Sequence, residues 1–468
     1  MTTASLRGRT VAVVGGGLAG LAAALECADQ GARVVLLERQ RRLGGLTWSF
    51  ERDGVQMDNG QHVYLACCDA YQRFLDRIGA TGDTVAPRPL DLPVVAPSPR
   101  GPLTARLRRR DLPVPLHLAG SLLRFPHVPL AGRLALGRAL AGLARLDAAD
   151  PALDRITFGE WLAAHGQTPE AVTGIWDLIT VPTVNLPAAE ASLAAAAMVF
   201  KTGVLGDRAA ADIGWSAVPL GRLHGERAAA ALARAGVEVR TGCRVTGIAG
   251  DPETSWEVYT PDGPLPADAV VVALPHEEAA TVVPETAVAD RRIWAGLGHS
   301  AVIDVHLVFD RRVTRWEVMA GHASPVQWVF DRTAASGLDR LRPGQQYLAV
   351  SLSAADSLLG ARPDQLVPSI VAALGALLPA VTQATLVDAF VTKERRATFR
   401  ARPGTAALRP PALTRRAGLV LAGAWTATGW PATMEGAVRS GMDAARALSA
   451  AAPDSNSRAS TPVPQEVA

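Results

Sequence analysis

Cysteine is scarce in this chain, which has only four in 468 residues: Cys27, Cys67, Cys68 and Cys243. No pair has the Cys-x-x-Cys spacing of a zinc ribbon or a thioredoxin-like redox site, and we predict no metal site. Four cysteines are also too few for the dense disulfide framework of a small secreted protein. A reducing, cytoplasmic compartment is therefore expected.

Long apolar runs and an excess of one charge are also missing. No run of about 18 uncharged apolar residues is present, and residues 1–9 lack the apolar core of a secretory signal, so neither a transmembrane helix nor a leader is expected. Lys+Arg 47 against Asp+Glu 44 gives a net charge of +3, which disfavours a dedicated nucleic-acid binder. Hydrophobic residues make up 49%, typical of a globular protein. At ~150 residues per domain, two to three domains are expected.

Residues 10–38 have the pattern of a buried strand (10–14), a glycine turn, a helix (18–30) and a second strand (33–38). The turn, Gly-Gly-Gly-Leu-Ala-Gly at 15–20, fits G-x-G-x-x-G in the strand–turn–helix context that this motif requires. Gly15 permits the tight turn, Gly17 lets the backbone approach a pyrophosphate, and Gly20 lets the helix pack on the strand. The pattern predicts a dinucleotide-binding site.

The residues around the turn would contact the same cofactor. The helix begins at Leu18 and Ala19, where free N–H groups and the positive end of the helix dipole favour phosphate. Glu38 ends the second strand, where its carboxylate can accept hydrogen bonds from ribose hydroxyls. The following residues supply a basic side chain for phosphate and a glycine pair that lets the backbone pass close to the cofactor, and we assign Arg39, Arg42, Gly44 and Gly45 to the site.

Together with Leu421–Thr426 and Pro431–Ala437 near the end of the chain, these motifs resemble the flavin-containing amine oxidase and phytoene desaturase superfamily. The resemblance implies FAD as the cofactor and a chain that returns to it at Gly423, Ala424, Ala432, Thr433 and Met434. It implies a helix from about 433 to 448 aimed at the flavin ring, and backbone contacts from Val245 to the adenine. An ordinary core valine is an equal reading of Val245.

The resemblance also implies the fold class. We predict an α/β fold in which a discontinuous Rossmann-like FAD-binding domain carries an inserted α+β substrate domain, as in amine oxidases. Residues 1–90, 222–285 and 405–450 are assigned to the FAD-binding domain. Residues 91–221 and 286–404 are assigned to the substrate domain, and 451–468 to a disordered tail.

A closer match lies in Asp58-Asn59-Gly60-Gln61-His62 and in residues 429–441, which resemble the hydroxysqualene dehydroxylases of bacterial hopanoid pathways. That resemblance implies removal of the hydroxyl of hydroxysqualene, a long-chain isoprenoid, to give squalene, with reduced FAD as the hydride source. It makes the preceding squalene-pathway synthases candidate partners. It also places Gly60 at the cofactor.

The reaction needs a proton donor near the departing oxygen, and the sequence offers three candidates: Asp58, His62 and Glu435. Each also has a structural reading. Asp58 can form a turn, His62 can be a satisfied structural histidine, and Glu435 lies where a helix N-terminus stabilises any carboxylate.

Two positions depart from the superfamily pattern: Leu46 stands where arginine is usual, and Ala424 where aspartate is usual. Losing both polar contacts would weaken FAD binding without removing the flavin chemistry. No second strand–turn–helix carries G-x-G-x-x-G, so direct binding of NAD(P)H is not supported.

Residues 100–146 contain nine arginines, one aspartate and many leucines. This composition suits contact with an anionic membrane, and we predict a cytoplasmic protein held peripherally at the inner face of the membrane. A solvated helical face beside a substrate tunnel is the alternative.

Two other functions remain open. A carotenoid-type desaturase would run the flavin in the oxidising direction on a similar polyene, whereas an amine oxidase is disfavoured because Lys201 and Lys393 are the only lysines. A non-catalytic isoprenoid-binding protein on the same scaffold would explain Leu46 and Ala424, but the intact glycine turn and Glu38 argue against it.

Overall fold

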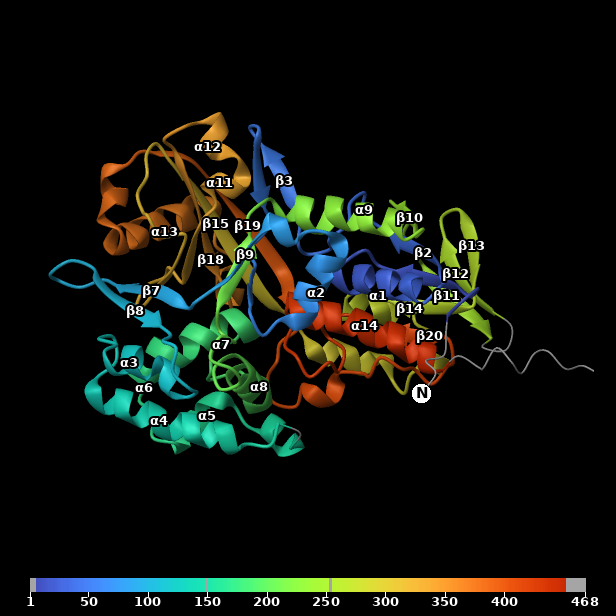
Figure 1. The fold of residues 1–468 in the computed structure, drawn as a ribbon, viewed down its shortest axis with the longest axis horizontal. Coiled ribbons are helices and arrows are strands. Elements are labelled where there is room, and N and C mark those ends of the chain that lie inside the picture. The colour runs from blue at the N-terminus through green and yellow to red at the C-terminus, as the bar shows by residue number, and fades with distance from the viewer. Residues whose placement is uncertain (1–5, 149, 252–254, 452–468) are drawn as a thin grey trace, which may run out of the picture.

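The computed structural model describes residues 6–148, 150–251 and 255–451 (Figure 1). Most of the segment assigned to a disordered tail, 452–468, therefore lies outside the described residues. Two large sheets organise the molecule, one parallel and one mixed, and a group of helices lies beside the mixed sheet.

The parallel sheet has five strands in the order β10-β2-β1-β14-β20. Their bounds are β1 Thr10–Val14, β2 Arg33–Glu38, β10 Glu238–Thr241, β14 Ala269–Val272 and β20 Leu419–Leu421. Alternate residues of β1 enter opposite cores: Val11 and Val13 pack on one face, Ala12 and Val14 on the other. Burial on both faces explains why these strands are continuous apolar runs.

Helices cover one face of this sheet: α1 (Leu18–Asp29), α2 (Asp69–Ile78), α9 (Arg227–Arg234) and α14 (Met434–Ala450). The antiparallel strands β11 (Gly247–Asp251), β12 (Ser255–Thr260) and β13 (Gly263–Ala267), with α10 (His276–Val282), cover the other. The last helix packs tightly on the first, since a Cβ at Gly441 would lie 2.1 Å from the carbonyl oxygen of Ala19.

The mixed sheet has the order β19-β15-β18-β17-β16-β7-β8. Its strands are β7 Asp91–Ala96, β8 Leu103–Arg108, β15 Ser300–Phe309, β16 Val318–Gly321, β17 Trp328–Asp331, β18 Gln346–Leu352 and β19 Leu386–Thr398. One face of β15, with Ile303 and Val305, packs in the core that includes α13 (Pro363–Leu377). Val308, on the other face, packs against the hairpin of β3 (Ser49–Arg52) and β4 (Val55–Asp58). The hairpin therefore joins the two sheets.

The remaining elements surround this frame. A small sheet contains β5 (Val63–Leu65), β9 (Ile213–Ser216) and β6 (Thr84–Arg88). The helical group contains α3 (Leu116–Leu123), α4 (Leu130–Arg145), α5 (Phe158–Ala164), α6 (Pro169–Ala171), α7 (Asp177–Val184) and α8 (Leu193–Gly203). Two short helices outside this group, α11 (Thr333–Ser336) and α12 (Leu338–Leu341), precede β18.

The strands predicted at 10–14 and 33–38, the helix predicted at 18–30 and the helix predicted from about 433 to 448 are present within two residues. Helix α8 begins at Leu193, because Ser192 caps it and the preceding residues form turns. The predicted α/β fold class is confirmed. The domain ranges stay a prediction, although the parallel sheet does take strands from all three segments assigned to the FAD-binding domain.

Candidate functional site

The turn between β1 and α1 requires glycine at the first and third positions of the motif, Gly15 and Gly20. Gly15 has φ +111°, and its N–H donates to the carbonyl of Leu37 at 2.8 Å. A Cβ at Gly20 would lie 1.8 Å from the carbonyl oxygen of Gly15, so this glycine sets how closely α1 approaches the strand. These contacts are what the dinucleotide-binding motif requires of its first and third glycines.

The N-terminus of α1 faces a surface made of backbone. Gly17 is the N-cap residue and supplies no side-chain cap, and the first turn carries no acid. A Cβ at Gly45 would lie 2.8 Å from the Cα of Gly17, and the N–H of Gly44 donates to the carbonyl of Gly16 at 2.9 Å. An uncapped helix N-terminus between two glycine segments fits a pyrophosphate.

Glu38 and its neighbours lie beside the glycine turn that precedes α1. Glu38 is 8% exposed, and its carboxylate accepts from the N–H groups of Gly16 at 2.6 Å and Gln40 at 2.7 Å. The N–H of Cys243 donates to the carbonyl of Glu38, which brings the segment containing the buried Val245 beside the end of β2. This arrangement fits an adenosine group between Glu38 and Val245.

The two basic residues assigned to the cofactor have partners of their own. Arg42 donates to the carbonyl of Gly45 at 3.0 Å and lies over the ring of Trp48 at 4.2 Å, and burial lowers its pKa. Arg39 is more exposed and pairs with Glu278 at 3.5 Å. Arg42 therefore holds the glycine pair in place, while Arg39 connects β2 to α10.

The C-terminal segment closes the site from the other side. Gly423, with φ +134°, follows β20, and its N–H donates to the Ser440 hydroxyl at 2.8 Å. Thr433 caps α14 by accepting from the N–H of Gly436 at 3.1 Å. Ala432 and Met434, on either side of Thr433, are partly buried. The resemblance predicts the flavin ring at this N-terminus of α14, and that placement stays a prediction.

Arg409 fixes this segment, and no sequence motif pointed to it. Its guanidinium donates to the carbonyls of Ala424 at 3.1 Å, Thr426 at 2.5 Å and Trp430 at 2.8 Å. Burial lowers its pKa to about 10. The arginine holds the loop through its backbone at the position where the superfamily's aspartate is replaced by Ala424.

Leu46, the other departure, is 45% exposed, and its carbonyl accepts from the Asn59 side chain at 2.8 Å. Both loops that lack the usual polar residue are therefore held through their backbones. The residues present fit FAD even though those two side-chain contacts are missing.

Asp58 is fully paired. Its carboxylate accepts from the Ser49 hydroxyl at 2.6 Å, from the N–H of Leu220 at 2.8 Å and from the Arg332 guanidinium at 2.9 Å. Both partners of the ion pair are buried. These contacts favour a structural role for the carboxylate, joining β4 to the start of α11.

Glu435 is also engaged. Its buried carboxylate accepts from the N–H groups of Ala70 at 3.2 Å and Tyr71 at 2.7 Å and from Arg439 at 2.6 Å. Burial raises its pKa, against the opposing effect of these donors. Glu435 therefore satisfies the N-terminus of α2 and ties α14 to it.

His62 differs from the two carboxylates. Its ring is partly exposed and makes no hydrogen bond within the described part of the chain. Burial lowers its pKa to about 4, an effect only partly offset by Asp58, so the imidazole is neutral at pH 7. A neutral ring without a partner is free to interact with a substrate.

Asp304, which the sequence analysis missed, lies beside His62. A Cβ at Gly60 would lie 3.4 Å from Asp304 Oδ2 and 3.7 Å from His62 Nε2. Asp304 is 2% exposed, and its Oδ1 is buried without a hydrogen-bond partner. Burial raises its pKa to about 7. A carboxylate within a mainly apolar strand, Ser300–Phe309, was the available signal.

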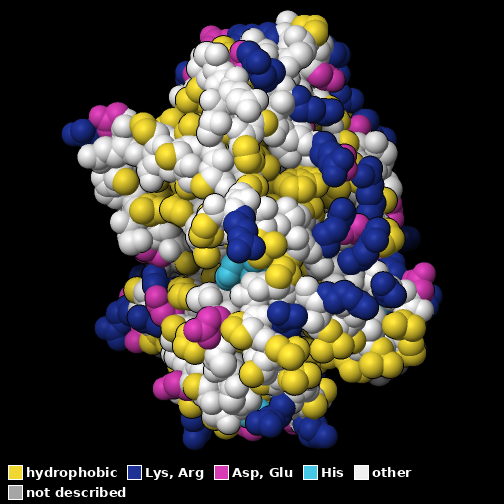
Figure 2. All heavy atoms as spheres, turned by 90° about the vertical axis from the view of Figure 1, so that its left-hand side faces the viewer, with side chains coloured by type: hydrophobic (Ala, Val, Ile, Leu, Met, Phe, Trp, Pro, Cys, Tyr) yellow, Lys and Arg dark blue, Asp and Glu magenta, His cyan; other side chains and the backbone are white. Residues whose placement is uncertain are grey.

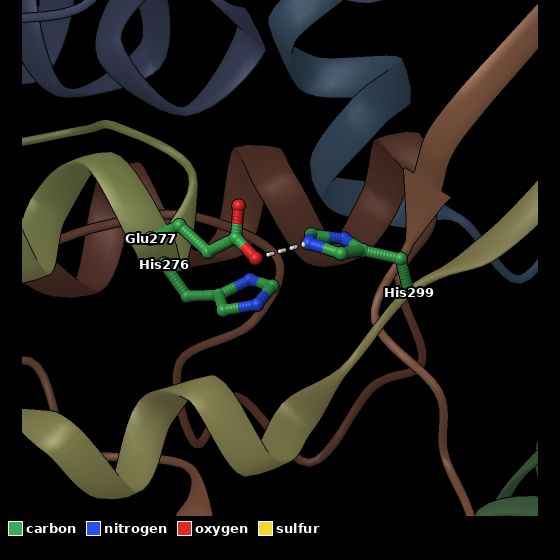
Figure 3. Close-up of side chains that lie close together, drawn as sticks. All are labelled: His276, Glu277 and His299. Atoms are coloured by element: carbon green, nitrogen blue, oxygen red, sulfur yellow. Dashed lines mark hydrogen bonds and ion pairs between the residues drawn. The ribbon is translucent and has the colours of Figure 1, made fainter.

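One group of potential metal ligands occurs among the described residues, His276, Glu277 and His299 (Figure 3). Glu277 pairs with His299 at 2.9 Å through one oxygen and with Arg396 at 2.6 Å through the other. His276 Nε2 is buried without a partner. Because the guanidinium already neutralises the carboxylate, we interpret the group as an ion-pair cluster, and the absence of a metal site stays a prediction.

Comparison with known proteins defines the class. Residues 18–449 match the family model for flavin containing amine oxidoreductase, so the protein is an FAD-dependent oxidoreductase. Cyclohexylamine oxidase from Brevibacterium oxydans superposes with a TM-score of 0.71 at 20% identity, covering 94% of this chain and 99% of that one. At this identity the superposition supports the fold alone.

Two curated relatives show which family of flavin-containing oxidoreductases the chain belongs to. Hydroxysqualene dehydroxylase from Rhodopseudomonas palustris is 30% identical, covering 95% of this chain and 99% of the relative. The protein of that name from Zymomonas mobilis is 29% identical, covering 92% and 97%. The chain belongs to the hydroxysqualene dehydroxylase family, as its motifs predicted. Zeta-carotene desaturase from Synechocystis is more distant, 24% identical with 94% and 96% covered.

Proposed function

We propose that the protein converts hydroxysqualene to squalene by reductive removal of the hydroxyl group, as a step in squalene and hopanoid biosynthesis. The observation that carries this proposal is the match to hydroxysqualene dehydroxylases over nearly the whole of both chains. Reduced FAD supplies the hydride in this chemistry. The synthases that make the substrate remain candidate partners.

The protein's own task is to deliver a proton and keep the site dry. The C–O bond breaks with its electron pair on oxygen, the oxygen takes a proton and leaves as water, and the carbon accepts the hydride. The proton must come from a group that is protonated at neutral pH. The carboxyl groups of Asp58 and Glu435 are each engaged by three donors, which favours a proton source in the group of Asp304 and His62.

The positions of the two lysines disfavour an amine oxidase. Lys201 donates to the backbone carbonyls of Ala144 and Leu146, and Lys393 to those of Leu359 and Ala361. Both ammonium groups are bound away from His62 and Asp304. A desaturase of related polyenes is the second candidate, favoured by the similarity to zeta-carotene desaturase.

The deciding experiment is anaerobic. The flavin of the purified protein is reduced with dithionite, hydroxysqualene is added in detergent, and the flavin spectrum and squalene are followed together. Reoxidation with one squalene formed per flavin supports the proposal. A flavin that stays reduced without squalene contradicts it, and reduction of the oxidised flavin by a carotenoid precursor would instead establish the desaturase.

We also propose that the helical group docks on the cytoplasmic face of an anionic membrane. Its surface exposes a set of leucines from β8, α3, α4 and the loops beside them: Leu103, Leu112, Leu116, Leu123, Leu130 and Leu134. Figure 2 shows hydrophobic side chains gathered on the lower part of this face, with basic side chains beside them. No helix among the described residues is long and apolar enough to cross a membrane.

The charges on this surface support an anionic partner. Arg106 and Arg108 share Asp91, whereas Arg124 and Arg133 make no ion pair in the described part of the chain and donate to backbone carbonyls. Basic side chains around exposed leucines combine attraction to anionic headgroups with burial of apolar surface. A substrate as apolar as hydroxysqualene would be taken up from the same bilayer.

A further inference from the structure

Two polar groups, Asp304 and His62, approach each other where the segment after β4 crosses β15. Asp304 Oδ1 is buried without a hydrogen bond, as is Gln61 Nε2 of the crossing segment, and the His62 ring has none within the described residues. A Cβ at Gly60 would lie 3.4 Å from Asp304 Oδ2 and 3.7 Å from His62 Nε2, so no side chain keeps these two groups apart. Buried polar atoms without partners are rare and mark a place where strain or a ligand is expected.

Asp304 is enclosed on every side. On β15 it is paired in register with Ser351 of β18 and Thr392 of β19. The charged and titratable groups packed around it are the Asp58–Arg332 pair and His62 from the facing segments, with Tyr347 of β18 and His306 of β15.

Taken together, the effects of these surroundings favour the protonated, neutral form of Asp304. Burial is the largest effect and raises the pKa of Asp304 to about 7, and the negative charge of Asp58 adds to it. Hydrogen bonds from Ser351 and from the backbone of Gln61 oppose the shift. An acid with a pKa near the working pH can both hold and release a proton.

We propose that Asp304 stores the proton for the departing hydroxyl group and that His62 carries it to the substrate, an inference that rests on the proposed function. Asp304 is 2% exposed and cannot meet a long isoprenoid itself, whereas the His62 ring is partly exposed. Asp304 is thus a positioning residue that acts through His62.

The transfer balances as follows. The C–O bond breaks with its electron pair on oxygen, and the oxygen takes the proton of one imidazole nitrogen as the other ring nitrogen accepts a proton from Asp304 across the space beside Gly60. The imidazole stays neutral throughout, and water leaves. The carbon accepts a hydride from reduced FAD, which supplies both electrons, and the Asp304 carboxylate is reprotonated from solvent.

The first test needs no turnover. Infrared spectra of the oxidised holoenzyme are recorded from pH 5 to 9, and the carbonyl band of a buried carboxylic acid is followed. The band is expected to disappear with a midpoint near pH 7, to be missing in Asp304→Asn, and to persist in Asp339→Asn, whose side chain is exposed on α12. Identical titrations in wild type and Asp304→Asn would overturn the proposal.

The second test separates proton supply from structure. In single-turnover reactions of dithionite-reduced holoenzyme with hydroxysqualene, the wild-type rate should fall as the pH rises through about 7, because Asp304 loses its proton. Asp304→Asn preserves the shape of the side chain but holds no transferable proton. Its single-turnover rate should be lower than that of wild type by a factor of ~100 or more and should lack this pH dependence. Asp304→Glu should restore the pH dependence.

Unchanged rate and pH profile in Asp304→Asn would assign the carboxyl a purely structural role and refute the inference while leaving the proposed function intact. A wild type that forms no squalene would instead refute the proposed function, and the infrared titration would still decide where the proton is held.

Discussion

At the scale of single residues, the cofactor site is built mainly from backbone. Gly17 and Gly45 approach each other closely, and Arg409 holds the C-terminal loop through its carbonyl groups. A site of this kind tolerates Leu46 and Ala424, because its shape does not depend on the two side chains that are missing. Added bulk at the glycines should therefore damage binding more than lost side chains do.

Gly17→Ala tests this directly. A Cβ at Gly17 would be 3.7 Å from its nearest neighbour, Gly45 Cα, so the protein itself accommodates it, but the methyl group would stand where a pyrophosphate must pass. We expect loss of bound FAD with an unchanged melting temperature of the apoprotein, measured by flavin absorbance and thermal unfolding. Gly82→Ala, in open space, is the control. A fully yellow Gly17→Ala protein would refute the pyrophosphate assignment.

A second residue-scale prediction concerns pH and stability. The pKa of Asp304 is raised from 3.8 to about 7, so its favourable contribution to folding is complete below pH 4 and is lost as the pH rises toward 7. Asparagine does not titrate, and Asp304→Asn should therefore gain on the order of 4 kcal/mol relative to wild type between pH 4 and 8.

Denaturant unfolding of the apoproteins at several pH values measures this difference, with Asp339→Asn as the exposed control. A constant difference between Asp304→Asn and wild type across the range would show that Asp304 is ionised throughout.

At the scale of elements, α14 connects parts of the chain that are far apart in sequence. It packs on α1 through Gly441 and caps α2 through Glu435. Thr433 caps its N-terminus, at the end of the loop that follows β20. The position of the C-terminal flavin contacts therefore depends on how firmly this helix is held.

Glu435→Ala distinguishes a cap from a catalytic acid. Removing the carboxylate leaves the N–H groups of Ala70 and Tyr71 without their acceptor, while Arg439 keeps only its pair with Asp69. We expect a loss of ~2 kcal/mol in the free energy of unfolding, with squalene formed per bound flavin unchanged. Asp443→Ala, on the exposed side of the same helix, should change neither. Normal stability with abolished turnover would instead make Glu435 the proton donor.

Across the whole molecule, the exposed leucines proposed for membrane contact lie mainly on the helical group, away from the parallel sheet that carries the glycine turn (Figure 1). This arrangement would separate the proposed membrane contact from the chemistry. Leu130 and Leu134, on adjacent turns of α4, are the most exposed of these leucines, at 61% and 64%.

The double variant Leu130→Glu/Leu134→Glu should bind vesicles containing anionic lipid at least ~10-fold more weakly, because it removes buried apolar area and adds negative charge. Co-sedimentation with phosphatidylglycerol vesicles measures this. Leu341 lies on α12 and is exposed to a similar extent, 55%, so Leu341→Glu is the matched control. Equal binding by the double variant and wild type would leave the surface without a membrane role.

The nucleotide-binding half of this protein could be predicted from local features of the chain. The apolar runs of β1 and β2, the spacing of Gly15, Gly17 and Gly20, and Glu38 are local features whose chemistry depends on residues close in the chain. The family resemblance extended this to the C-terminal return, which the structure places beside the same sheet.

Only the tertiary structure decided which polar groups are available for chemistry. Asp58 and Glu435 looked free in the sequence, yet partners 274 and 365 positions away in the chain occupy them. Asp304 looked like one residue of an apolar strand, yet the crossing of β15 by the segment after β4 buries it beside His62. Burial and pairing arise from contacts distant in sequence, and they set which carboxyl group keeps its proton.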